Sequence, residues 1–558
     1  MSVSVLVALL TALLVATTHC HEFIHPLSNL KIAATVQQLD DNISIEAAPT
    51  VLQTSGSFVQ VTWSGVSKPS KHDWIGVYAP READYTKKAP IKYQYAHASS
   101  THMSHGFGSL RFHMVNMRTD IGFVFFRHGI HHPAVASVSN RVIFQNPNEP
   151  LQIHLALTHN PRTISVSWVS GAVSNPQVKW GELSEKYSHW SKAVWSTYSA
   201  SDLCGEPAAT LGWREPGWLI AANITNLLPD TFYYYIVGDD KYGWSKELSF
   251  VSPKLPNSSV TTKVVAFGDM GNGMVDESLQ HWEQQPSLKT TKLISQRISE
   301  TDIVLHIGDM SYAVGYAAEW DEFFDQISPI ASHVPYMVCI GNHERDFPHS
   351  NGYFDGTDSG GECGVPHERR FLMPRPRPDE PWYGVKYGNI HFIFMSTEHD
   401  WRPGSAQAVF LERELASVNR SQTPWVVFSG HRPMYVDSTD AFGRGSDTVV
   451  SKSLRQHVEH LLQLYGVDLA LWGHHHSYQR SCPVYNETCT ASGTTHVVIG
   501  MAGQSLSHTF RPIKPVWAVY LDDKHHGYSR FEANGTHLTF TYIRNDDNDV
   551  HDQFTLVK

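Results

Sequence analysis

Residues that could bind metal ions occur in five short blocks of this chain, and almost every block follows an apolar run. The apolar runs have the length and the β-branched content of buried parallel strands. A side chain that follows such a strand emerges at the carboxyl edge of the sheet, so we expect the five blocks to meet there. The blocks are GDMG (268–271), GDMSY (308–312), GNHE (341–344), SGHRP (429–433) and GHHH (473–476).

The side chains of these blocks predict the kind of site. They are two carboxylates, a phenol, an amide and three imidazoles, from Asp269, Asp309, Tyr312, Asn342, His431, His474 and His476. Such a mixed set of oxygen and nitrogen ligands suits two hard or borderline metal ions, whereas a structural zinc site would show pairs of cysteines. Gathering so many ionisable groups without a metal would be costly. The blocks therefore predict a hydrolytic site with two metal ions.

The order of the blocks resembles the signature of the purple acid phosphatases, a family within the calcineurin-like metallophosphoesterases. That signature runs GDxG, GDxxY, GNH(E/D), a single histidine after a strand, and GHxH. Further stretches similar to the family extend over most of the chain, for example LCGEPA (203–208) and YQRSCPVY (478–485). The stretch DWIGVY (73–78) is similar to an additional N-terminal module of the large plant-type members.

The resemblance implies a role for each ligand. Fe(III) would be bound by Asp269, Tyr312 and His476, a divalent ion (Zn, Mn or Fe) by Asn342, His431 and His474, and both ions by a bridging Asp309. A phenolate is a hard donor that stabilises ferric iron, and amide and imidazole donors suit the divalent ion. The ions would lower the pKa of a bound water, and the resulting hydroxide would attack phosphorus. His343 resembles the family's substrate-binding histidine, which could hydrogen-bond the phosphate or protonate the leaving oxygen; a supporting role beside the ligands is the alternative.

The chain departs from the family's pattern on the substrate side of the site. Better-known plant members carry two adjacent histidines nine and ten residues after the single ligand histidine, where this chain has Asp440 and Ala441. The residues that we expect to contact substrate are His343, Asn342, His399, Arg345 and Arg432. A buried structural role is an equal alternative for His399, and surface arginines are usually solvated. Gln479 stands where many relatives have glutamate, and His475 is expected to point away from the metals.

Length and composition describe a multidomain globular protein. A chain of 558 residues exceeds one ordinary domain and predicts about two to four. A hydrophobic fraction of 41% and a charged fraction of 17% allow an adequate core. The formal net charge of −11 argues against a polyanion-binding surface, so we expect no nucleic-acid polymer as a partner.

The first residues and several surface signals predict a secreted protein. Residues 1–20 have the character of a signal peptide, with a signal anchor as the alternative, and no other apolar run approaches the length of a membrane span. We therefore expect no membrane anchor and a location outside the cell, in the cell wall or in a vacuole. Candidate glycosylation triplets occur at Asn42, Asn223, Asn257, Asn419, Asn486 and Asn534.

The six cysteines fit an oxidising compartment. Cys482 and Cys489 are close enough in sequence to close a small loop through a disulfide bond. Cys204 and Cys363 lie in loop-like contexts and could pair across domains. Cys339 lies within the apolar run YMVCI, so we expect a buried free thiol there.

The pattern of strands and helices predicts three domains after the signal peptide. Residues 21–147 and 148–256 show short alternating strands separated by turns, which predicts two β-sandwiches. The second resembles a fibronectin type III domain. Residues 257–558 alternate apolar strands with helical segments such as 451–465, which predicts an α/β metallophosphoesterase domain. The resemblance implies a β-sandwich core for it, and the last strands, from about residue 495, should complete a sheet layer.

The expected function is a secreted acid phosphatase that hydrolyses phosphate monoesters with two metal ions. A second hypothesis keeps the site and changes the substrate to phosphodiesters or nucleotide pyrophosphates, because the histidine pair is altered. A third is a catalytically silent binding protein on the same scaffold, against which the intact ligand set argues. The expected partner is a small phosphorylated molecule, and the resemblance implies homodimers, as in the plant members.

Overall fold

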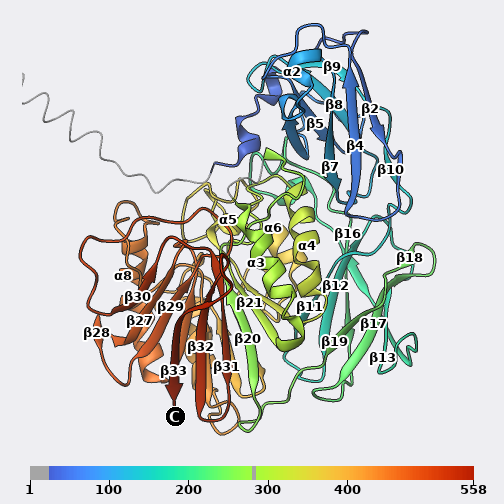
Figure 1. Ribbon diagram of the computed structural model, residues 1–558. Helices are drawn as coiled ribbons and strands as arrows, with labels where there is room; N and C mark the ends of the chain where they lie inside the picture. The colour runs from blue at the N-terminus through green and yellow to red at the C-terminus, as the bar shows by residue number, and fades with distance from the viewer. Residues whose placement is uncertain (1–23, 280–283) are drawn as a thin grey trace, which may run out of the picture.

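Two β-sandwiches precede a larger layered domain along the chain (Figure 1). The computed structural model describes residues 24–279 and 284–558, so the signal peptide expected for residues 1–20 lies outside the described residues. The first sandwich projects from the top of the molecule in Figure 1, and the second lies along one side of the layered domain. This arrangement confirms the predicted fold class.

The first sandwich contains the alternating strands that the sequence predicts. Its elements are β1 (Val36–Gln37), β2 (Ser44–Ala48), β3 (Val51–Leu52), β4 (Ser57–Ser64), β5 (Trp74–Tyr78), β6 (Lys92–Tyr95), α2 (His102–His105), β7 (Gly108–Met114), β8 (Gly122–Arg127), β9 (Ala134–Val138) and β10 (Ile143–Phe144). A five-stranded sheet, in the order β1-β9-β8-β5-β6, packs on a three-stranded sheet, β2-β4-β7. Ile75 and Val77 of β5 share a core with Val59 and Phe112 of the other sheet. The DWIGVY stretch is thus an inner strand of this module.

The second sandwich packs against the layered domain. Its strands are β11 (Leu151–Leu157), β12 (Ile164–Ser170), β13 (Gln177–Gly181), β14 (His189–Lys192), β15 (Val194–Ser196), β16 (Trp218–Ile224), β17 (Phe232–Asp239), β18 (Gly243–Trp244) and β19 (Leu248–Val251). The sheets have the orders β11-β12-β16-β15 and β14-β13-β17-β18, with β19 also beside β17. Trp168 and Tyr235 lie in the core between them. The Tyr235 hydroxyl donates to the Ser332 carbonyl (2.6 Å), which ties this sandwich to the layered domain.

The layered domain begins with β20 (Thr262–Phe267). Its further strands are β21 (Ile303–Ile307), β22 (Tyr336–Cys339), β23 (Tyr383–Tyr387), β24 (Ile390–Phe394), β25 (Trp425–Ser429), β26 (Leu469–Trp472), β27 (Tyr478–Tyr485), β28 (Thr488–Cys489), β29 (Thr494–Ile499), β30 (Ala518–Asp522), β31 (Gly527–Ala533), β32 (His537–Arg544) and β33 (Val550–Val557). Its helices are α3 (Pro286–Ser295), α4 (Ala318–Ala331), α5 (Asn342–Arg345), α6 (Val365–Arg370), α7 (Ala406–Ala416), α8 (Asp447–His457) and α9 (Glu459–Leu464).

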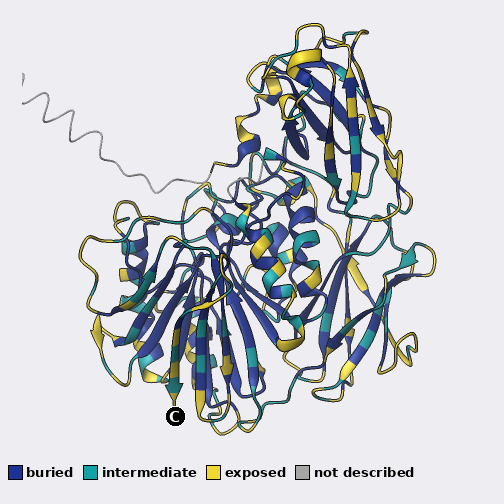
Figure 2. Cartoon of the chain, in the orientation of Figure 1, coloured by how far each residue is buried: buried dark blue, intermediate teal, exposed yellow. Residues whose placement is uncertain are grey.

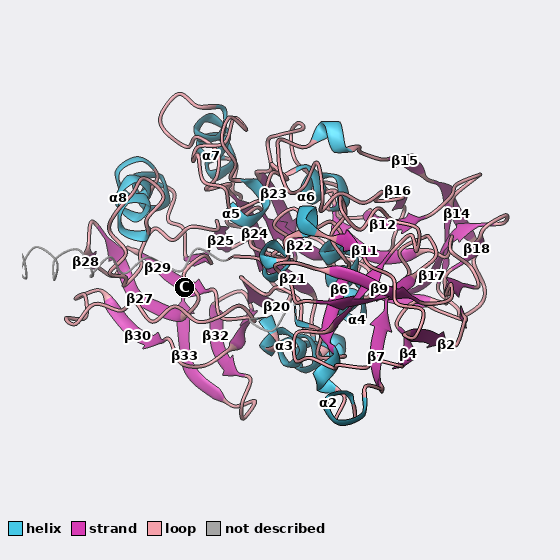
Figure 3. Cartoon of the chain, turned by 90° about the horizontal axis from the view of Figure 1, so that it is seen from above, coloured by secondary structure: helices cyan, strands magenta, loops and turns pink. Residues whose placement is uncertain are grey.

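Two mixed sheets form the centre of this domain. One has the order β22-β21-β20-β31-β32-β33, and the other has the order β23-β24-β25-β26-β29-β27-β28 with β30 beside β27. Leu305 of the first sheet and Phe392 and Leu469 of the second belong to one shared core. The strands of the layered domain are largely buried, as the dark blue in Figure 2 shows. Helices α3 and α4 lie on one side of the sheets, and α7 and α8 lie on the opposite side (Figure 3). Alternate strand residues such as Ile393 and Val426 pack against the α7–α9 layer.

Two expectations about this domain need correction. The closing strands do not complete a single layer, because β29 lies within the second sheet beside β26, whereas β31, β32 and β33 extend the first. The helical segment 451–465 is divided into α8 and α9 at Val458, whose φ of −118° leaves the helical range. The apolar residues that share one helical face, Leu454, Val458, Leu461 and Leu462, are nevertheless all buried.

Both expected disulfides are present. Cys482–Cys489 closes a short loop, with Cα atoms 5.7 Å apart, and Cys204–Cys363 joins the second sandwich to the layered domain, with Cα atoms 6.1 Å apart. Cys339 is a buried free thiol, as predicted. All six candidate glycosylation asparagines are exposed. In the part of the chain that the structure describes, no helix is long and apolar enough to cross a membrane.

Candidate metal centre

The five ligand-bearing blocks follow parallel strands at one end of the two sheets. Three blocks follow β20, β21 and β22, which are neighbours in the first sheet, and two follow β25 and β26, which are neighbours in the second. Because the two sheets face each other, the carboxyl ends of these strands meet. Four of the candidate ligands adopt left-handed backbone conformations, with φ between 50° and 67°: Asp269, Asp309, Tyr312 and His474. Such strained positions are typical of sites where side-chain direction matters.

One group of ligand atoms lies around the amide of Asn342. Its Oδ1 is 3.0 Å from His431 Nε2 and 2.9 Å from His474 Nδ1. His431 Nε2 is also 3.2 Å from Asp309 Oδ2. Two atoms bound to one ion at about 2.1 Å lie roughly 3.0–3.4 Å apart when they subtend about 90–109°. The group therefore has the spacing of ligands around one ion.

The hydrogen bonds of His431 show why a cation fits this group. Its Nδ1 donates to the Ile307 carbonyl (2.9 Å), which leaves a lone pair on Nε2 of the neutral ring. That lone pair faces the oxygen atoms of Asp309 and Asn342. Burial lowers the pKa of His431, but the Asp309 carboxylate outweighs it and raises the pKa to about 10. The Asp309 carboxylate therefore stabilises a positive charge at this position, either a proton on His431 or a metal ion.

A second group of ligand atoms lies around the phenol of Tyr312. Its hydroxyl is 3.0 Å from His476 Nε2, 3.4 Å from Asp269 Oδ1 and 3.5 Å from Asp309 Oδ2. His476 Nδ1 lies 2.7 Å from the Ser505 carbonyl, so Nε2 carries the lone pair here too. Burial and the Asp269 carboxylate raise the pKa of Tyr312 well above its usual value. A phenolate ligand would thus require a strongly charged cation beside it.

Asp309 belongs to both groups and is the only candidate ligand that does. The described residues contain two sets of carboxylate and imidazole groups with the spacing of metal ligands, one formed by Asp309, His431 and His474 and the other by Asp269, Asp309 and His476. Burial opposes ionisation of Asp309, but His431 and His343 hold its pKa well below the usual value. An ionised carboxylate between two groups of donors fits a bridge between two ions.

Comparison with known proteins is consistent with this geometry and identifies the family. Four family profiles match: "Fn3-like domain from Purple Acid Phosphatase" (45–146), "Purple acid Phosphatase, N-terminal domain" (150–252), "Calcineurin-like phosphoesterase" (262–478) and "Iron/zinc purple acid phosphatase-like protein C" (493–553). A solved purple acid phosphatase from yellow lupin seeds is similar with a TM-score of 0.87 and 37% identity, over 93% of this chain and 96% of that one. The chain belongs to the purple acid phosphatase family.

Two curated relatives differ in what their names say about activity. "Probable inactive purple acid phosphatase 1" of Arabidopsis thaliana is 37% identical over 96% of this chain and 92% of its own length. A "Nucleotide pyrophosphatase/phosphodiesterase" of Hordeum vulgare is 38% identical over 57% of this chain and 89% of its own length. The resemblance to the purple acid phosphatases is thus confirmed, and the activity of this member has to be argued from its own residues.

Glu344 organises the centre without belonging to either group of ligand atoms. Its carboxylate accepts backbone N–H groups of Asp309 (2.9 Å), Met310 (2.8 Å) and Gly341 (2.9 Å). It thereby fixes the turn after β21 to the turn after β22, and holds the bridging carboxylate in place. The sequence signals no role for Glu344 beyond its place in the block GNHE.

His343 lies beside Asp309, the carboxylate that the two ligand groups share. Its Nε2 is 4.0 Å from Asp309 Oδ2, and its ring centroid is 4.5 Å from that of Tyr312. Its Nδ1 donates a hydrogen bond to the Asp358 carbonyl (3.2 Å). The other ring nitrogen, Nε2, therefore faces the metal centre. His343 thus lies next to residues of both ligand groups.

The structure does not bring His399 or Arg345 to the metal centre. His399 Nδ1 is 2.7 Å from Ser396 Oγ, and Nε2 is 3.4 Å from Asp379 Oδ1. Arg345 donates to the carbonyl groups of Cys363 and Ser350, and its guanidinium is 3.0 Å from Asp379. Both side chains are buried in loop structure. These contacts favour the structural alternative for His399, and they show that Arg345 is buried rather than solvated at the surface.

Replacing His399 by alanine is therefore expected to change kcat/KM by no more than about threefold, because its ring contacts no candidate ligand. A matched change, His343→Ala, should lower kcat/KM by about 10²–10⁴-fold, the usual contribution of a positioned acid or base. Initial rates on an aryl phosphate would measure both. A large loss of kcat/KM in a normally folded His399→Ala variant would contradict this expectation and indicate that His399 contacts the substrate.

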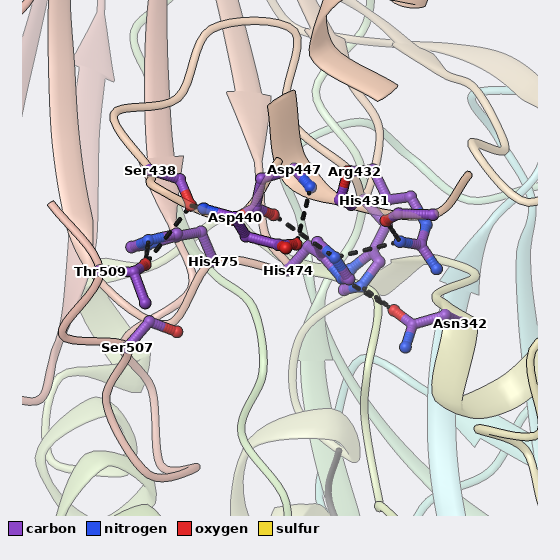
Figure 4. Close-up of polar contacts among 12 residues, drawn as sticks. Asn342, His431, Arg432, Ser438, Asp440, Asp447, His474, His475, Ser507 and Thr509 are labelled. Atoms are coloured by element: carbon purple, nitrogen blue, oxygen red, sulfur yellow. Dashed lines mark hydrogen bonds and ion pairs between the residues drawn. The ribbon is translucent and has the colours of Figure 1, made fainter. Parts of the chain in front are cut away.

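Arg432 is at the centre but does not project into open space. It is buried between Glu398 (2.9 Å) and Asp346 (3.0 Å), and its Nη1 lies 3.1 Å from His474 Nε2 (Figure 4). Burial and Arg432 lower the pKa of His474 well below its usual value, which keeps the ring neutral. A neutral imidazole is the metal-binding form. Arg432 is therefore held by two carboxylates and packs against His474, away from open space.

His475 points away from the ligand groups, as expected. Its Nε2 lies 2.9 Å from Thr509 Oγ1 (Figure 4), and its Nδ1 lies 2.7 Å from Ser477 Oγ. Gln479, where many relatives have glutamate, donates toward the same ring (3.2 Å) and accepts the backbone N–H of Asp437 (2.7 Å). Both the oxygen and the nitrogen of the Gln479 side-chain amide thus have hydrogen-bond partners.

Proposed function

We propose that this protein is a metal-dependent acid phosphatase that hydrolyses phosphate monoesters. The observation that supports this most is the convergence of all seven ligand-type side chains into two groups that share Asp309. Loss of a single ligand would have favoured a catalytically silent binding protein, and none is lost. The intact centre supports activity here even though several relatives bear the name "probable inactive".

We assign Fe(III) to the group around Tyr312 and a divalent ion (Zn, Mn or Fe) to the group around Asn342. The bound ions would provide a hydroxide nucleophile in acid and neutralise the phosphoryl oxygens. The Asn342 amide nitrogen donates to Asp358 Oδ2 (2.8 Å), which keeps its Oδ1 directed at the imidazoles. His343 holds the phosphate or protonates the leaving oxygen. Arg432 and Glu344 hold the surrounding turns in place through hydrogen bonds to backbone groups.

The iron assignment predicts a spectroscopic change. Tyr312→Phe is expected to abolish the visible absorption band of the purified protein, because charge transfer from a phenolate to Fe(III) gives the family its colour. Absorption spectra and metal analysis would measure this. Tyr316→Phe is the matched control, since that ring stacks on His25 outside the ligand groups. An unchanged band in Tyr312→Phe would contradict the assignment of Fe(III) to this group.

A second candidate function is hydrolysis of nucleotide pyrophosphates or phosphodiesters. It is favoured by the similarity to the barley enzyme and by Asp440, which occupies the position of a family histidine. Initial rates at acidic pH on an aryl monoester, a bis-aryl diester and a nucleoside triphosphate separate the two functions. Fast monoester hydrolysis supports the acid phosphatase; preference for the other substrates supports the second candidate. No turnover by the metal-loaded protein would exclude both.

We further propose that the protein is secreted after removal of residues 1–20 and glycosylated at the six exposed asparagines. Two disulfides in the described residues support an oxidising compartment. We also propose that its substrate is a small phosphorylated molecule and that it forms homodimers.

A further inference from the structure

One short segment, residues 357–364, contacts two functional side chains of the metal centre at once. The Asp358 carboxylate accepts a hydrogen bond from the Asn342 side-chain nitrogen (2.8 Å). The Asp358 carbonyl accepts a second one from His343 Nδ1 (3.2 Å). A single residue outside both ligand groups therefore holds a candidate ligand and the histidine that lies beside the shared Asp309.

The Asp358 carboxylate decides which end of the Asn342 amide faces the imidazoles. An ionised carboxylate only accepts hydrogen bonds, so it must face the nitrogen end of the amide. The amide oxygen is then turned toward His431 Nε2 (3.0 Å) and His474 Nδ1 (2.9 Å). Half a turn of the amide would exchange its two ends and present N–H groups, which cannot bind a cation. The contact with Asp358 therefore favours the metal-binding orientation.

The same segment is fastened to the second sandwich. Cys363 forms its disulfide bond with Cys204, which lies in the loop between β15 and β16. The Cys204 N–H also donates to the Gly361 carbonyl (2.9 Å). The Ala208 N–H donates to the Gly360 carbonyl (3.1 Å). A loop of the second sandwich thus holds several consecutive residues of the segment.

Two glycines permit this close approach. A Cβ atom on Gly361 would lie 2.4 Å from the carbonyl oxygen of Gly205 in the second sandwich. A Cβ atom on Gly360 would lie 2.2 Å from the carbonyl oxygen of Val314, in the loop after β21. Both glycines have positive φ, 89° and 56°, which side chains disfavour. The segment is therefore packed between the second sandwich and a loop of the metal centre.

The layered domain holds the other side of the segment. The Ser359 N–H donates to the Asp346 carbonyl (3.1 Å), and the Gly364 N–H donates to the Glu344 carbonyl (2.6 Å). Glu344 belongs to α5, which begins at Asn342, and Asp346 follows the end of this helix. The segment thus bridges the second sandwich and the short helix that carries a candidate ligand.

We propose that the second sandwich helps to build the divalent site, because its disulfide bond holds Asp358 in place as a positioning residue for Asn342 and His343. The proposal rests on the divalent ion assigned above to the group around Asn342. Asp358 acts through the amide that it orients, and this orientation raises the affinity of the site for the ion. The second sandwich is thereby part of the metal centre, although it supplies no ligand.

The affinity of the iron-containing protein for Zn²⁺ tests the role of Asp358. In Asp358→Ala we expect the Zn²⁺ dissociation constant, measured by competition with a chelator, to rise about 10–100-fold, the usual effect of losing the partner of a metal ligand. Iron content and the visible band should stay at the wild-type level, because the ligand atoms around Tyr312 are unchanged. An unchanged Zn²⁺ affinity, or an equal loss of zinc and iron, would overturn the positioning role.

Two further variants serve as controls for this measurement. Asp358→Asn keeps an oxygen that can accept the hydrogen bond from Asn342, so its Zn²⁺ affinity should fall by no more than about threefold. Asp355→Ala removes an exposed carboxylate from the same stretch of chain and should bind Zn²⁺ as tightly as wild type.

A comparison of the two disulfide bonds tests the role of the second sandwich. Replacing Cys204 and Cys363 together by serine should weaken Zn²⁺ binding less than Asp358→Ala does, by about 3–10-fold, because backbone hydrogen bonds still hold the segment. Replacing Cys482 and Cys489 by serine is the matched control, since it removes the disulfide bond of a short loop between β27 and β28. Wild-type Zn²⁺ affinity in the first double variant would exclude the second sandwich from the site.

These affinities separate the proposal from the function on which it rests. If wild type bound iron and Zn²⁺ in this Asp358-dependent way but hydrolysed nothing, the phosphatase function would fail and the positioning role would stand. If Asp358→Ala matched wild type in Zn²⁺ affinity and in the hydrolysis of an aryl phosphate, the positioning role would fail and the function would stand.

Discussion

Asp309→Asn is expected to lower kcat/KM on an aryl phosphate by about three orders of magnitude or more and to reduce the bound metal to less than one ion per chain. The carboxylate is the only candidate ligand that both groups share. An amide cannot bridge two cations with two anionic oxygens, and losing the charge stabilisation that a two-metal site gives the transition state costs several kcal/mol. Rates and metal analysis on the same preparation measure the two effects together.

The control for this change is Asp355→Asn, which removes a carboxylate from an exposed position of a nearby loop. It should retain wild-type metal content and rates within about twofold. Full metal occupancy with normal activity in Asp309→Asn would show that the two groups do not share a bridge.

Lys92→Met is expected to destabilise the protein by about 3–5 kcal/mol, because it leaves buried carboxylates without their partner. Lys92 lies in β6 of the first sandwich and is fully buried. Its Nζ is 2.7 Å from Glu322 Oε1 and 3.6 Å from Asp276 Oδ2. Burial lowers the pKa of this lysine, but the two carboxylates outweigh it and hold the group charged. Urea unfolding followed by intrinsic fluorescence would measure the loss.

Glu322 belongs to α4, which follows the loop after Tyr312. Arg118 of the first sandwich binds the same helix through Asp321 (2.7 and 2.9 Å). Lys87→Met is the matched control, since that lysine lies on the surface of the same sandwich in an exposed pair and should cost less than about 1 kcal/mol. Equal stability of the two variants would exclude a structural role for the buried pair.

Asp276 sets the pH dependence of the interface between the first sandwich and the layered domain. Burial raises the pKa of Asp276, but Lys92 and a backbone N–H outweigh it and lower the pKa below its usual value. A carboxylate whose pKa is lowered by folding stabilises the folded state fully above its unfolded pKa, near 4, and loses this contribution as pH falls further. The interface is therefore expected to keep its full stability at the mildly acidic pH of the proposed reaction and to weaken below about pH 4.

Much of the metal centre follows from local sequence. Each ligand block is fixed by an apolar run, which forms a strand, and by a turn that starts where the strand ends. The order of the blocks resembles one family, and this resemblance implies the ligand set that the structure gathers. The strands of both sandwiches and the two disulfides are likewise close to the expectation, because alternation and spacing are properties of short segments.

What the sequence could not determine depends on contacts between distant segments. Strand pairing divides the closing strands between two sheets, since β29 finds a parallel neighbour in β26 whereas β31 pairs with β20. The directions of Arg345 and His399 depend on carbonyl and carboxylate groups of other loops. A residue type predicts which chemistry a side chain can perform, but its partners decide whether it faces the site.

By itself, the sequence determined the family and the sandwich architecture and predicted the ligand set, because strands and turns are set by neighbouring residues. Only the tertiary structure decided that Asp309 lies between two ligand groups and that Asp440 turns into its own loop. These facts depend on distances between atoms that the chain brings together from far apart, and burial then sets the charge that each group carries.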